Sequence, residues 1–161
     1  MTTIRTARPE DYLIIGEIAV EAYAEGDNLP ADGSYDSVLR NAADRATEAE
    51  LLVALDDDKP VGTVTVVRPG GSYSEIARED ELEFRMLAVA PQAAGRGIGR
   101  ALVEAVFERA RAERFARVVL CVQERAAVPR RLYERMGFRR LPERDWSPTA
   151  GIRLLGYYLD L

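Results

Sequence analysis

Residues 91–103 read PQAAGRGIGRALV and contain three alternating glycines, Gly95, Gly97 and Gly99. The stretch follows the apolar run at 86–90 and precedes an amphipathic segment, an order that predicts strand, glycine turn and helix. Such a turn directs backbone N–H groups and the positive end of a helix dipole toward an anion. Glycine suits it because glycine tolerates positive φ and lets a ligand approach the backbone closely. The stretch therefore predicts a site for the phosphates of a ligand.

Two common phosphate-binding patterns do not fit this turn. The dinucleotide pattern G-x-G-x-x-G would need glycine in place of Arg100, and a P-loop would end in Gly-Lys-Ser or Gly-Lys-Thr. We therefore expect a third kind of phosphate ligand. The alternative is a purely structural turn between a strand and a helix, although three alternating glycines are more than such a turn needs.

Length and composition predict one domain over residues 1–161. The chain is 47% hydrophobic and 30% charged, which is typical of a globular protein with one core. No apolar run approaches the roughly 18–20 residues of a membrane span, and the first residues do not resemble a signal peptide. The single cysteine, Cys121, lies in an apolar run and suits a buried thiol in a reducing cytoplasm. We expect a cytoplasmic protein without a membrane partner.

The chain contains no histidine, which excludes a histidine-dependent catalytic triad and the common zinc sites. We therefore expect no metal, and any general base must be a carboxylate, a tyrosine, a lysine or water. The net charge of −5 argues against nucleic acid as a partner.

Hydrophobic periodicity and turn residues predict alternating strands and helices. Expected strands cover residues 3–7, 51–55, 61–67, 81–90, 117–122, 138–141 and 152–161, with a polar connection at 69–80. Expected helices cover 9–25, 35–48 and 98–114, and a last helix contains Val128, Leu132 and Met136 and ends at Gly137. The strand, helix and strand over 81–122 form a βαβ unit with parallel strands. The pattern predicts an α/β fold with a mixed sheet and helices on both faces.

Two segments resemble those of the GNAT family of N-acetyltransferases, which use acyl-CoA. The family segment R/Q-x-x-G-x-G/A cradles the CoA pyrophosphate, and residues 83–106, EFRMLAVAPQAAGRGIGRALVEAV, follow it and its preceding strand closely. The second family segment ends in L-Y-E-x-x-G-F, which here is LYERMGF at 132–138. The N-terminal stretch IRTARPEDYLIIGEI at 4–18 resembles the family's first strand and helix.

Two positions depart from the family pattern. Ala94 stands where the family usually has arginine or glutamine, and Ala126 stands where an asparagine often contacts CoA. A second alignment, Gln92-x-x-Gly95-x-Gly97, recovers the glutamine but misplaces the start of the helix. Either loss would weaken CoA binding without removing the backbone amides.

The resemblance implies a GNAT fold: a twisted, mostly antiparallel sheet of six or seven strands with one splayed parallel pair and about four helices. It implies acetyl-CoA as co-substrate, with the pantetheine arm lying between the splayed strands and bonded by the backbone there. The implied CoA-binding residues are Leu87, Ala88, Val89, Ala94, Gly95, Arg96, Gly97, Ile98, Gly99 and Arg100.

Tyr133 and Glu83 are the catalytic residues that the resemblance implies. A phenol near the sulfur could protonate the departing thiolate; the alternative role of Tyr133 is packing beneath Phe138. Glu83 stands eleven residues before Ala94, where many family members carry a base, and Glu81 lies two residues away on the same strand face. Of two neighbouring carboxylates, one can have a raised pKa that suits a base. The alternative for both is a solvent-facing strand edge.

The acceptor site is expected where the first helices meet the late strands. Its candidate residues are Tyr23, Asp27, Asp32, Tyr35, Tyr73, Glu75, Glu81 and Trp146, whose acidic and aromatic character suits a cationic amine. We expect acetyl transfer to a small primary amine by direct attack in a ternary complex, since Cys121 lacks a histidine to activate it. The alternatives are a peptide or protein amine as acceptor, or a CoA-binding module without catalysis. A homodimer is common in this family and is expected here by analogy.

Overall fold

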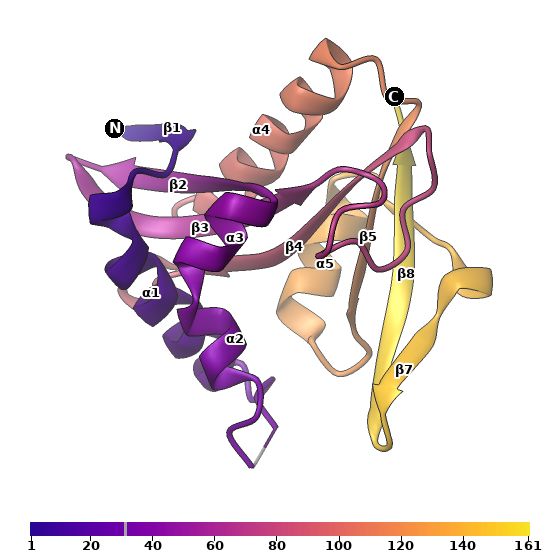
Figure 1. Cartoon of the computed structure of the whole chain (residues 1–161), viewed down its shortest axis with the longest axis horizontal. Helices are drawn as coiled ribbons and strands as arrows, with labels where there is room; N and C mark the ends of the chain where they lie inside the picture. Colours follow the sequence, from indigo (N-terminus) through magenta and orange to yellow (C-terminus); the bar gives the residue numbers. More distant parts are fainter. Residues whose placement is uncertain (31) are drawn as a thin grey trace.

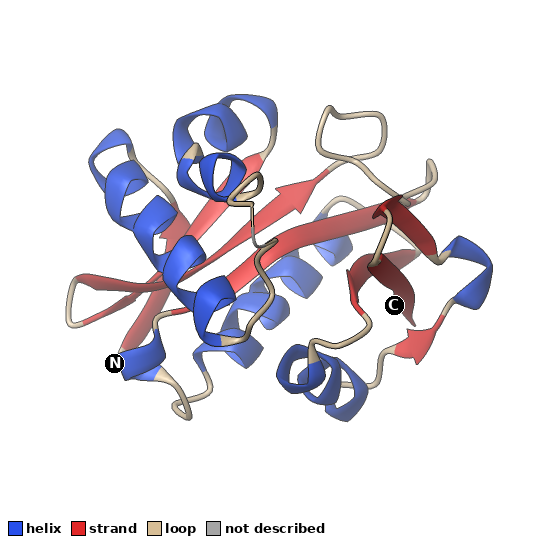
Figure 2. Ribbon diagram, turned by 90° about the horizontal axis from the view of Figure 1, so that it is seen from below, coloured by secondary structure: helices blue, strands red, loops and turns tan. Residues whose placement is uncertain are grey.

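An eight-stranded sheet with helices on both faces forms the centre of the computed structural model, which describes residues 1–30 and 32–161 (Figure 1, Figure 2). The strands are β1 (Thr2–Thr6), β2 (Glu50–Asp56), β3 (Lys59–Val67), β4 (Glu81–Val89), β5 (Arg117–Gln123), β6 (Arg139–Arg140), β7 (Trp146–Thr149) and β8 (Ile152–Asp160). The helices are α1 (Tyr12–Glu25), α2 (Asp36–Arg40), α3 (Ala42–Glu48), α4 (Ile98–Ala112) and α5 (Ala127–Arg135). Three short 3-10 helices cover Pro9–Asp11, Pro91–Ala93 and Pro142–Arg144.

The strand order is β1-β2-β3-β4-β5-β8-β6, and β7 pairs with β8. β4 and β5 are parallel, whereas the other recorded pairs are antiparallel. This mixed sheet confirms the predicted fold class, with α4 joining the two parallel strands. The short strand β7 was not predicted, because a four-residue segment that contains Pro148 has no recognisable alternation.

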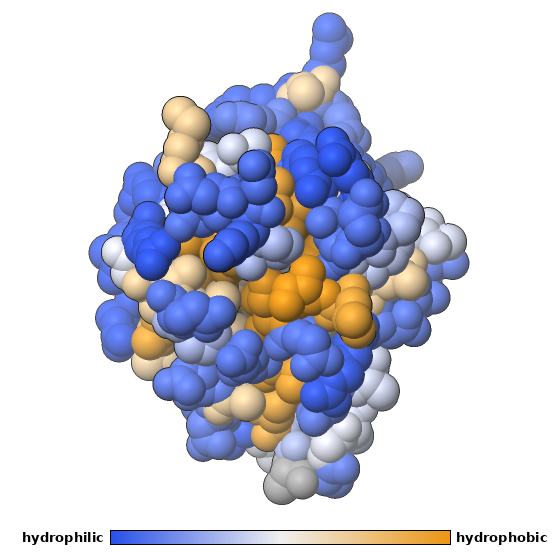
Figure 3. Space-filling view, turned by 90° about the vertical axis from the view of Figure 1, so that its left-hand side faces the viewer, coloured by the Kyte–Doolittle hydropathy of each residue, from blue (hydrophilic) through white to orange (hydrophobic). Residues whose placement is uncertain are grey.

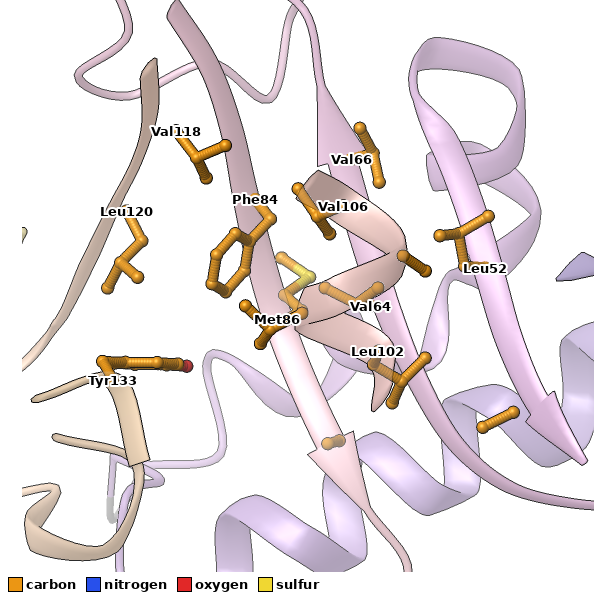
Figure 4. Close-up of a cluster of buried hydrophobic side chains, with 14 of the residues drawn as sticks. Leu52, Val64, Val66, Phe84, Met86, Leu102, Val106, Val118, Leu120 and Tyr133 are labelled. Carbon is orange, nitrogen blue, oxygen red and sulfur yellow. The ribbon is translucent and has the colours of Figure 1, made fainter. Parts of the chain in front are cut away.

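Each face of the sheet packs on its own group of helices. Leu52, Val64 and Phe84 face α4 and form one buried cluster with Leu102 and Val106 of that helix (Figure 4). On the other face, Leu51, Val53 and Leu55 of β2 form a second cluster with Ile15 of α1 and Ala42 of α3. Because both faces are covered, β2 is apolar at consecutive positions rather than alternating positions. Each such buried side chain contributes about 1.5–3 kcal/mol.

The face of the molecule that carries the β2–β3 turn is largely hydrophilic, with an apolar patch near its centre (Figure 3). Leu13 and Ile14 of α1 are among the exposed large apolar side chains of the described residues. No helix in that part of the chain combines the length and the apolar character needed to cross a membrane.

The expected single helix at 35–48 is wrong, because the chain breaks it at Asn41. This residue has ψ of 63°, outside the helical range, and its side chain accepts a hydrogen bond from the N–H of Asp44 at 3.2 Å. Asn41 is therefore the N-cap of α3, a role that asparagine fills well. The end of α5 was predicted correctly: Gly137 has φ of 101°, and the N–H of Phe138 bonds to the carbonyl of Tyr133 at 3.0 Å.

The parallel pairing of β4 with β5 is short. Residues 81–83 of β4 pair with residues 117–119 of β5, and no later pair joins the two strands within the described residues. β4 continues to Val89, while β5 continues to Gln123 along β8. The sheet therefore opens between the second halves of these strands.

Candidate active site

A bulge in β4 lies directly beside this opening. Met86 has φ of 55°, and the register with β3 shifts between Thr63 and Thr65. An extra residue in one strand bends it and turns the following side chains to the other face. The bend carries the second half of β4 away from β5 and helps to create the opening.

The backbone of β4 beyond the bulge presents unpaired groups to the opening. Ala90 donates its N–H to the carbonyl of Val61 at 2.8 Å, toward β3. Successive residues of a strand direct their N–H groups to opposite sides. Val89 and Leu87 therefore direct theirs away from β3 and toward the opening, where the predicted pantetheine-binding segment Leu87, Ala88 and Val89 lies.

The glycine turn leads into α4 at the same end of the sheet. Gly95 and Gly97 have φ of 82° and 75°, and a Cβ on either would meet no atom within 4 Å. Gly97 is the N-cap of α4, which begins at Ile98 and leaves its first N–H groups without intrahelical partners. Gly99 has a different role, because a Cβ there would lie 3.3 Å from Leu132 of α5. Two of the three glycines thus shape the turn, and the third permits close packing.

The two arginines of the turn form exposed ion pairs within the chain. Arg96 lies 2.7 Å from Asp56, and Arg100 lies 3.0 Å from Glu104. Exposed pairs of this kind are worth less than about 1 kcal/mol. A phosphate could therefore displace either carboxylate at small cost. Ala94, which precedes the turn, has extended backbone.

Tyr133 extends from α5 toward Met86 of β4, across the opening (Figure 4). The side chain is 4% exposed and packs edge-on against Phe84 and Phe138, with ring centroids 5.7 and 5.8 Å apart. Burial raises its pKa above the usual range, and the nearby Cys121 adds to the effect. The phenol is therefore protonated at neutral pH. Both roles expected for Tyr133 are compatible with this position, since its ring packs on Phe138 and its hydroxyl points to the opening.

Glu81 and Glu83 are buried, so the alternative of a solvent-facing strand edge is wrong for both. Glu81 forms an ion pair with Arg144, with Nη2 at 3.1 Å from Oε2, and accepts the N–H of Arg78 at 2.8 Å. Burial alone would raise the pKa of Glu81, but these partners bring it below its usual value. Glu81 is therefore an ionised carboxylate that already binds Arg144 and the backbone of Arg78.

Glu83 has no exposed surface and binds the backbone of the connection between β3 and β4. Its carboxylate accepts the N–H groups of Glu75, Ile76 and Ala77 at 3.0, 3.2 and 3.1 Å. Burial raises its pKa; the three N–H donors oppose that effect, and the charge of Glu75 reinforces it. The carboxylate neighbour that matters electrostatically is therefore Glu75, not Glu81 as the strand pattern predicts.

Glu75 joins Glu83 to the rest of the site. Ligand atoms of Glu75, Glu83 and Cys121 lie within 4.8 Å of one another. Arg85 contacts Glu75 at 2.9 Å, and the Cys121 thiol donates to Glu75 at 3.2 Å. Burial raises the pKa of Cys121 well above its usual value, so the thiol is unreactive. Because Arg85 and backbone donors already bind both carboxylates, the cluster suits proton transfer better than a cation.

Three expected acceptor residues converge on Arg85. Tyr23 and Tyr35 have ring centroids 6.0 Å apart, and Arg85 donates to the Tyr35 hydroxyl at 3.3 Å. Arg85 also donates to the carbonyl of Tyr73 at 3.1 Å and lies over its ring. Burial, together with the hydrogen bond to Asp44, raises the pKa of Tyr73 to about 12. Arg85 itself was not predicted, although its alternation with Glu83 along β4 was the available signal.

Trp146 borders a shallow hollow of about 460 Å³ beside this cluster, together with Glu75 and Glu143. It lies on β7, whose existence was not predicted. Asp27 and Asp32 remain on the exposed loop after α1, and Asp32 accepts the N–H of Ser34 at 2.9 Å. The structure therefore groups the aromatic candidates with Glu75 but leaves these two aspartates outside the cluster.

Comparison with solved structures finds the same fold in several proteins. A GNAT-family protein from Desulfovibrio desulfuricans is 22% identical, with 99% of each chain covered and a TM-score of 0.79. The PaiA N-acetyltransferase from Thermoplasma acidophilum, solved in complex with coenzyme A, is 16% identical, covering 100% and 99%, with a TM-score of 0.78. A ribosomal-protein-alanine N-acetyltransferase from Brucella melitensis is 21% identical, covering 99% of each chain, with a TM-score of 0.67. A search of curated proteins found no match.

The sequence itself matches a family model. Residues 14–138 match the model described as the acetyltransferase (GNAT) family. This range contains the bulged strand, the glycine turn and the helix that carries Tyr133. The chain belongs to the GNAT family of acetyltransferases.

Proposed function

We propose that residues 1–161 act as a single domain that transfers the acetyl group of acetyl-CoA to a primary amine of a small molecule. The observation that carries this proposal is the opening between β4 and β5, which ends at a turn with two positive-φ glycines at the N-terminus of α4. An extended arm with amide groups fits the opening, and a pyrophosphate fits the turn. The coenzyme A bound in the Thermoplasma relative supports the assignment.

CoA binding is assigned to the backbone. The N–H groups at the start of α4 and in the turn 94–100 bind the pyrophosphate, helped by the dipole of a fifteen-residue helix. Leu87 and Val89 bind the amides of the pantetheine arm as an added strand would. When CoA binds, Arg96 leaves Asp56 and Arg100 leaves Glu104, and both guanidinium groups bind phosphate oxygens instead.

The transfer moves two protons of the ammonium form of the acceptor. The first passes to the Glu75–Glu83 pair, in which Glu83 has the raised pKa and Glu75 is the more exposed member, and leaves a lone pair on nitrogen. The amine nitrogen then attacks the acetyl carbon, the tetrahedral intermediate collapses, and the C–S bond breaks. Tyr133 gives its phenolic proton to the departing thiolate, and the second proton of the former amine restores the phenol.

Two other functions remain in competition with this one. A peptide or protein amine is an alternative acceptor, and a ribosomal-protein-alanine N-acetyltransferase from Brucella melitensis shares the fold of this chain. A CoA-binding module without catalysis is the second alternative, and Ala94 and Ala126 are the residues that favour it. A screen of small amines and peptides as acceptors distinguishes the peptide alternative from the proposed function. Any measured turnover excludes the non-catalytic alternative. A cytoplasmic homodimer is the assembly proposed by family analogy.

Calorimetric titration with acetyl-CoA tests the coenzyme assignment, with free ADP as the control ligand. We expect micromolar binding of acetyl-CoA and much weaker binding of ADP. The substitution Gly97→Val should weaken acetyl-CoA at least about tenfold, because a β-branched residue at φ of 75° is strained and its side chain enters the phosphate site. Gly151→Val is the matched control, with φ of 85° and equally open surroundings in the β7–β8 turn. Equal affinity for acetyl-CoA in both variants would contradict the assignment.

The Glu75–Glu83 pair predicts a pH dependence of turnover. Because burial raises the pKa of Glu83 above its usual 4.5, the wild-type rate should fall as the pH drops through that raised value and the base becomes protonated. Glu83→Gln should lower kcat about 100-fold and remove this acidic limb. Glu75→Gln leaves the backbone contacts of Glu83 in place and should shift the limb to lower pH, since a neighbouring negative charge is lost. Wild-type pH profiles in both folded variants would assign the proton to water instead.

A further inference from the structure

Arg45 of α3 is a buried cation, and only one of the three guanidinium nitrogens donates hydrogen bonds to the described residues. Its side chain has no exposed surface. Nη1 donates to the carbonyls of Val38 and Leu39 at 2.7 and 2.9 Å, near the end of α2. Nε and Nη2 are buried and have no hydrogen-bond partner among residues 1–30 and 32–161. One edge of the guanidinium therefore caps a helix, and the other edge is left with unsatisfied donors.

The lack of a counter-ion distinguishes Arg45 from the other well-buried arginines. Arg144, whose side chain is 10% exposed, pairs with Glu81, and Arg85, at 16%, pairs with Glu75. Arg45 is more buried than either, yet no carboxylate in the described part of the chain lies within ion-pair distance of it. A buried charge is costly unless a partner compensates it. The missing partner is therefore an anion that the described residues do not supply.

The geometry of the free edge selects the kind of anion. Nε–H and one N–H of Nη2 point in parallel from the same edge of a guanidinium, which is the arrangement that binds two oxygens of a carboxylate or a phosphate. The phosphates of CoA are assigned to the opposite face of the sheet, which leaves a carboxylate of the acceptor. Thr65 has a second orphaned group, because its buried hydroxyl also lacks a partner. Thr65 lies directly opposite Leu51 of β2 and Arg85 of β4, on the face of the sheet that packs on α1 and α3. Arg45 and Thr65 thus belong to the same layer of the molecule.

This layer is the acceptor side of the site and not the CoA side. Asp44, which precedes Arg45 on α3, accepts a hydrogen bond from the Tyr73 hydroxyl at 2.5 Å. Tyr73 belongs to the aromatic cluster that leads through Arg85 to Glu75. The glycine turn that is assigned to the CoA phosphates lies at the N-terminus of α4, which packs on the opposite face of the sheet.

We propose that the acetyl acceptor carries a carboxylate, and that Nε and Nη2 of Arg45 bind it. This inference rests on the proposed acetyl transfer and narrows its substrate class to amino acids and related amines with a carboxylate. The amino group of such a zwitterion lies toward Glu75, and its carboxylate lies toward Arg45. The acidic and aromatic candidates alone predict a simple cationic amine, and Arg45 changes that expectation.

Matched pairs of acceptors test the proposal. We would measure kcat/KM with acetyl-CoA for alanine, glutamate, phenylalanine, β-alanine and γ-aminobutyrate, and for the carboxamide of each. The wild type should favour at least one acid over its amide by at least about tenfold, the value of a charge-assisted hydrogen-bonded pair. Arg45→Gln should lose that preference while still acetylating the amide. Arg40→Gln, which removes an exposed arginine from α2, is the control and should keep the preference.

A binding measurement separates this inference from the proposed reaction. The melting temperature of the CoA-bound protein is measured with each N-acetyl amino acid and with its amide. A melting temperature that rises with an N-acetyl amino acid but not with its amide supports the carboxylate site, even if no amine is acetylated. Arg45→Lys should abolish this rise, because lysine keeps the positive charge but lacks the two parallel N–H groups of the guanidinium. The inference would be overturned if every amide matched its acid in kcat/KM and in the melting temperature of its complex. Arg45 would then be a helix cap only. An absence of any rise and of any turnover preference would overturn it as well.

Discussion

Replacing Tyr133 by phenylalanine is expected to lower kcat about 100-fold, the typical contribution of a positioned general acid. The dissociation constant of acetyl-CoA should change less than about twofold, because the ring packing on Phe84 and Phe138 is kept. Steady-state kinetics together with calorimetry measure the two effects separately. The loss should appear in the chemical step, since the hydroxyl is needed only when the thiolate leaves.

Tyr157→Phe is the matched control for this substitution. Tyr157 is equally buried and packs beside Tyr133, but its hydroxyl donates to Glu134 at 3.0 Å and accepts from Arg130 at 3.1 Å. Losing those bonds should cost about 1 kcal/mol of stability and little activity. If Tyr133→Phe keeps the wild-type kcat, the tyrosine is a packing residue and the proton comes from elsewhere.

Replacing Arg144 by leucine should lower the free energy of unfolding by up to about 3–5 kcal/mol, because it removes the closer ion-pair partner of the buried Glu81 carboxylate and leaves only Arg117, at 3.8 Å, in its place. Arg144 also donates to the carbonyl of Ile76 at 3.1 Å, so the loop that binds Glu83 should loosen and kcat should fall as well. Urea denaturation measures the stability. Arg153→Leu, which breaks the more exposed pair with Asp145, should cost less than about 1 kcal/mol.

The Glu81–Arg144 pair also predicts how the stability difference between wild type and Arg144→Leu depends on pH. The folded-state pKa of Glu81 lies below its usual 4.5, so the carboxylate contributes its full stabilisation above that value. The contribution is lost as the pH falls through the folded-state pKa. The stability gap between wild type and Arg144→Leu should therefore be largest near neutral pH and shrink in acid. A gap that stays constant from neutral pH to acid would show that lost packing, and not the ion pair, causes the destabilisation.

The repeating parts of the fold could be predicted from the sequence, because periodicity and turn residues are local signals. The strand before the turn, the helix after it and the end of α5 at Gly137 were all visible in this way. The break at Asn41 was also local, since asparagine is a good N-cap, but the apolar spacing across it resembled one continuous helix. The error over residues 35–48 arose because the apolar spacing was given more weight than the N-cap preference of asparagine.

The electrostatic roles could not be predicted, because they depend on partners far away in the sequence. Glu81 and Glu83 share a strand and a face, yet Arg144 lowers the pKa of the first, whereas burial raises the pKa of the second despite the N–H donors at 75–77. Arg45 lies in the polar segment AADRATE, where an arginine is expected to face solvent. Its burial follows from how α2 and α3 pack on the sheet, which no local pattern records.

The short pairing of β4 with β5 also makes the folded chain incomplete on its own. Beyond residues 83 and 119, two strand edges face each other without forming a ladder, and unpaired edges are templates for association with other strands. A pantetheine arm lying there would act as a missing strand and occupy the edge of β4. The co-substrate would then serve as a structural element, so the resistance of this protein to aggregation would follow the supply of coenzyme.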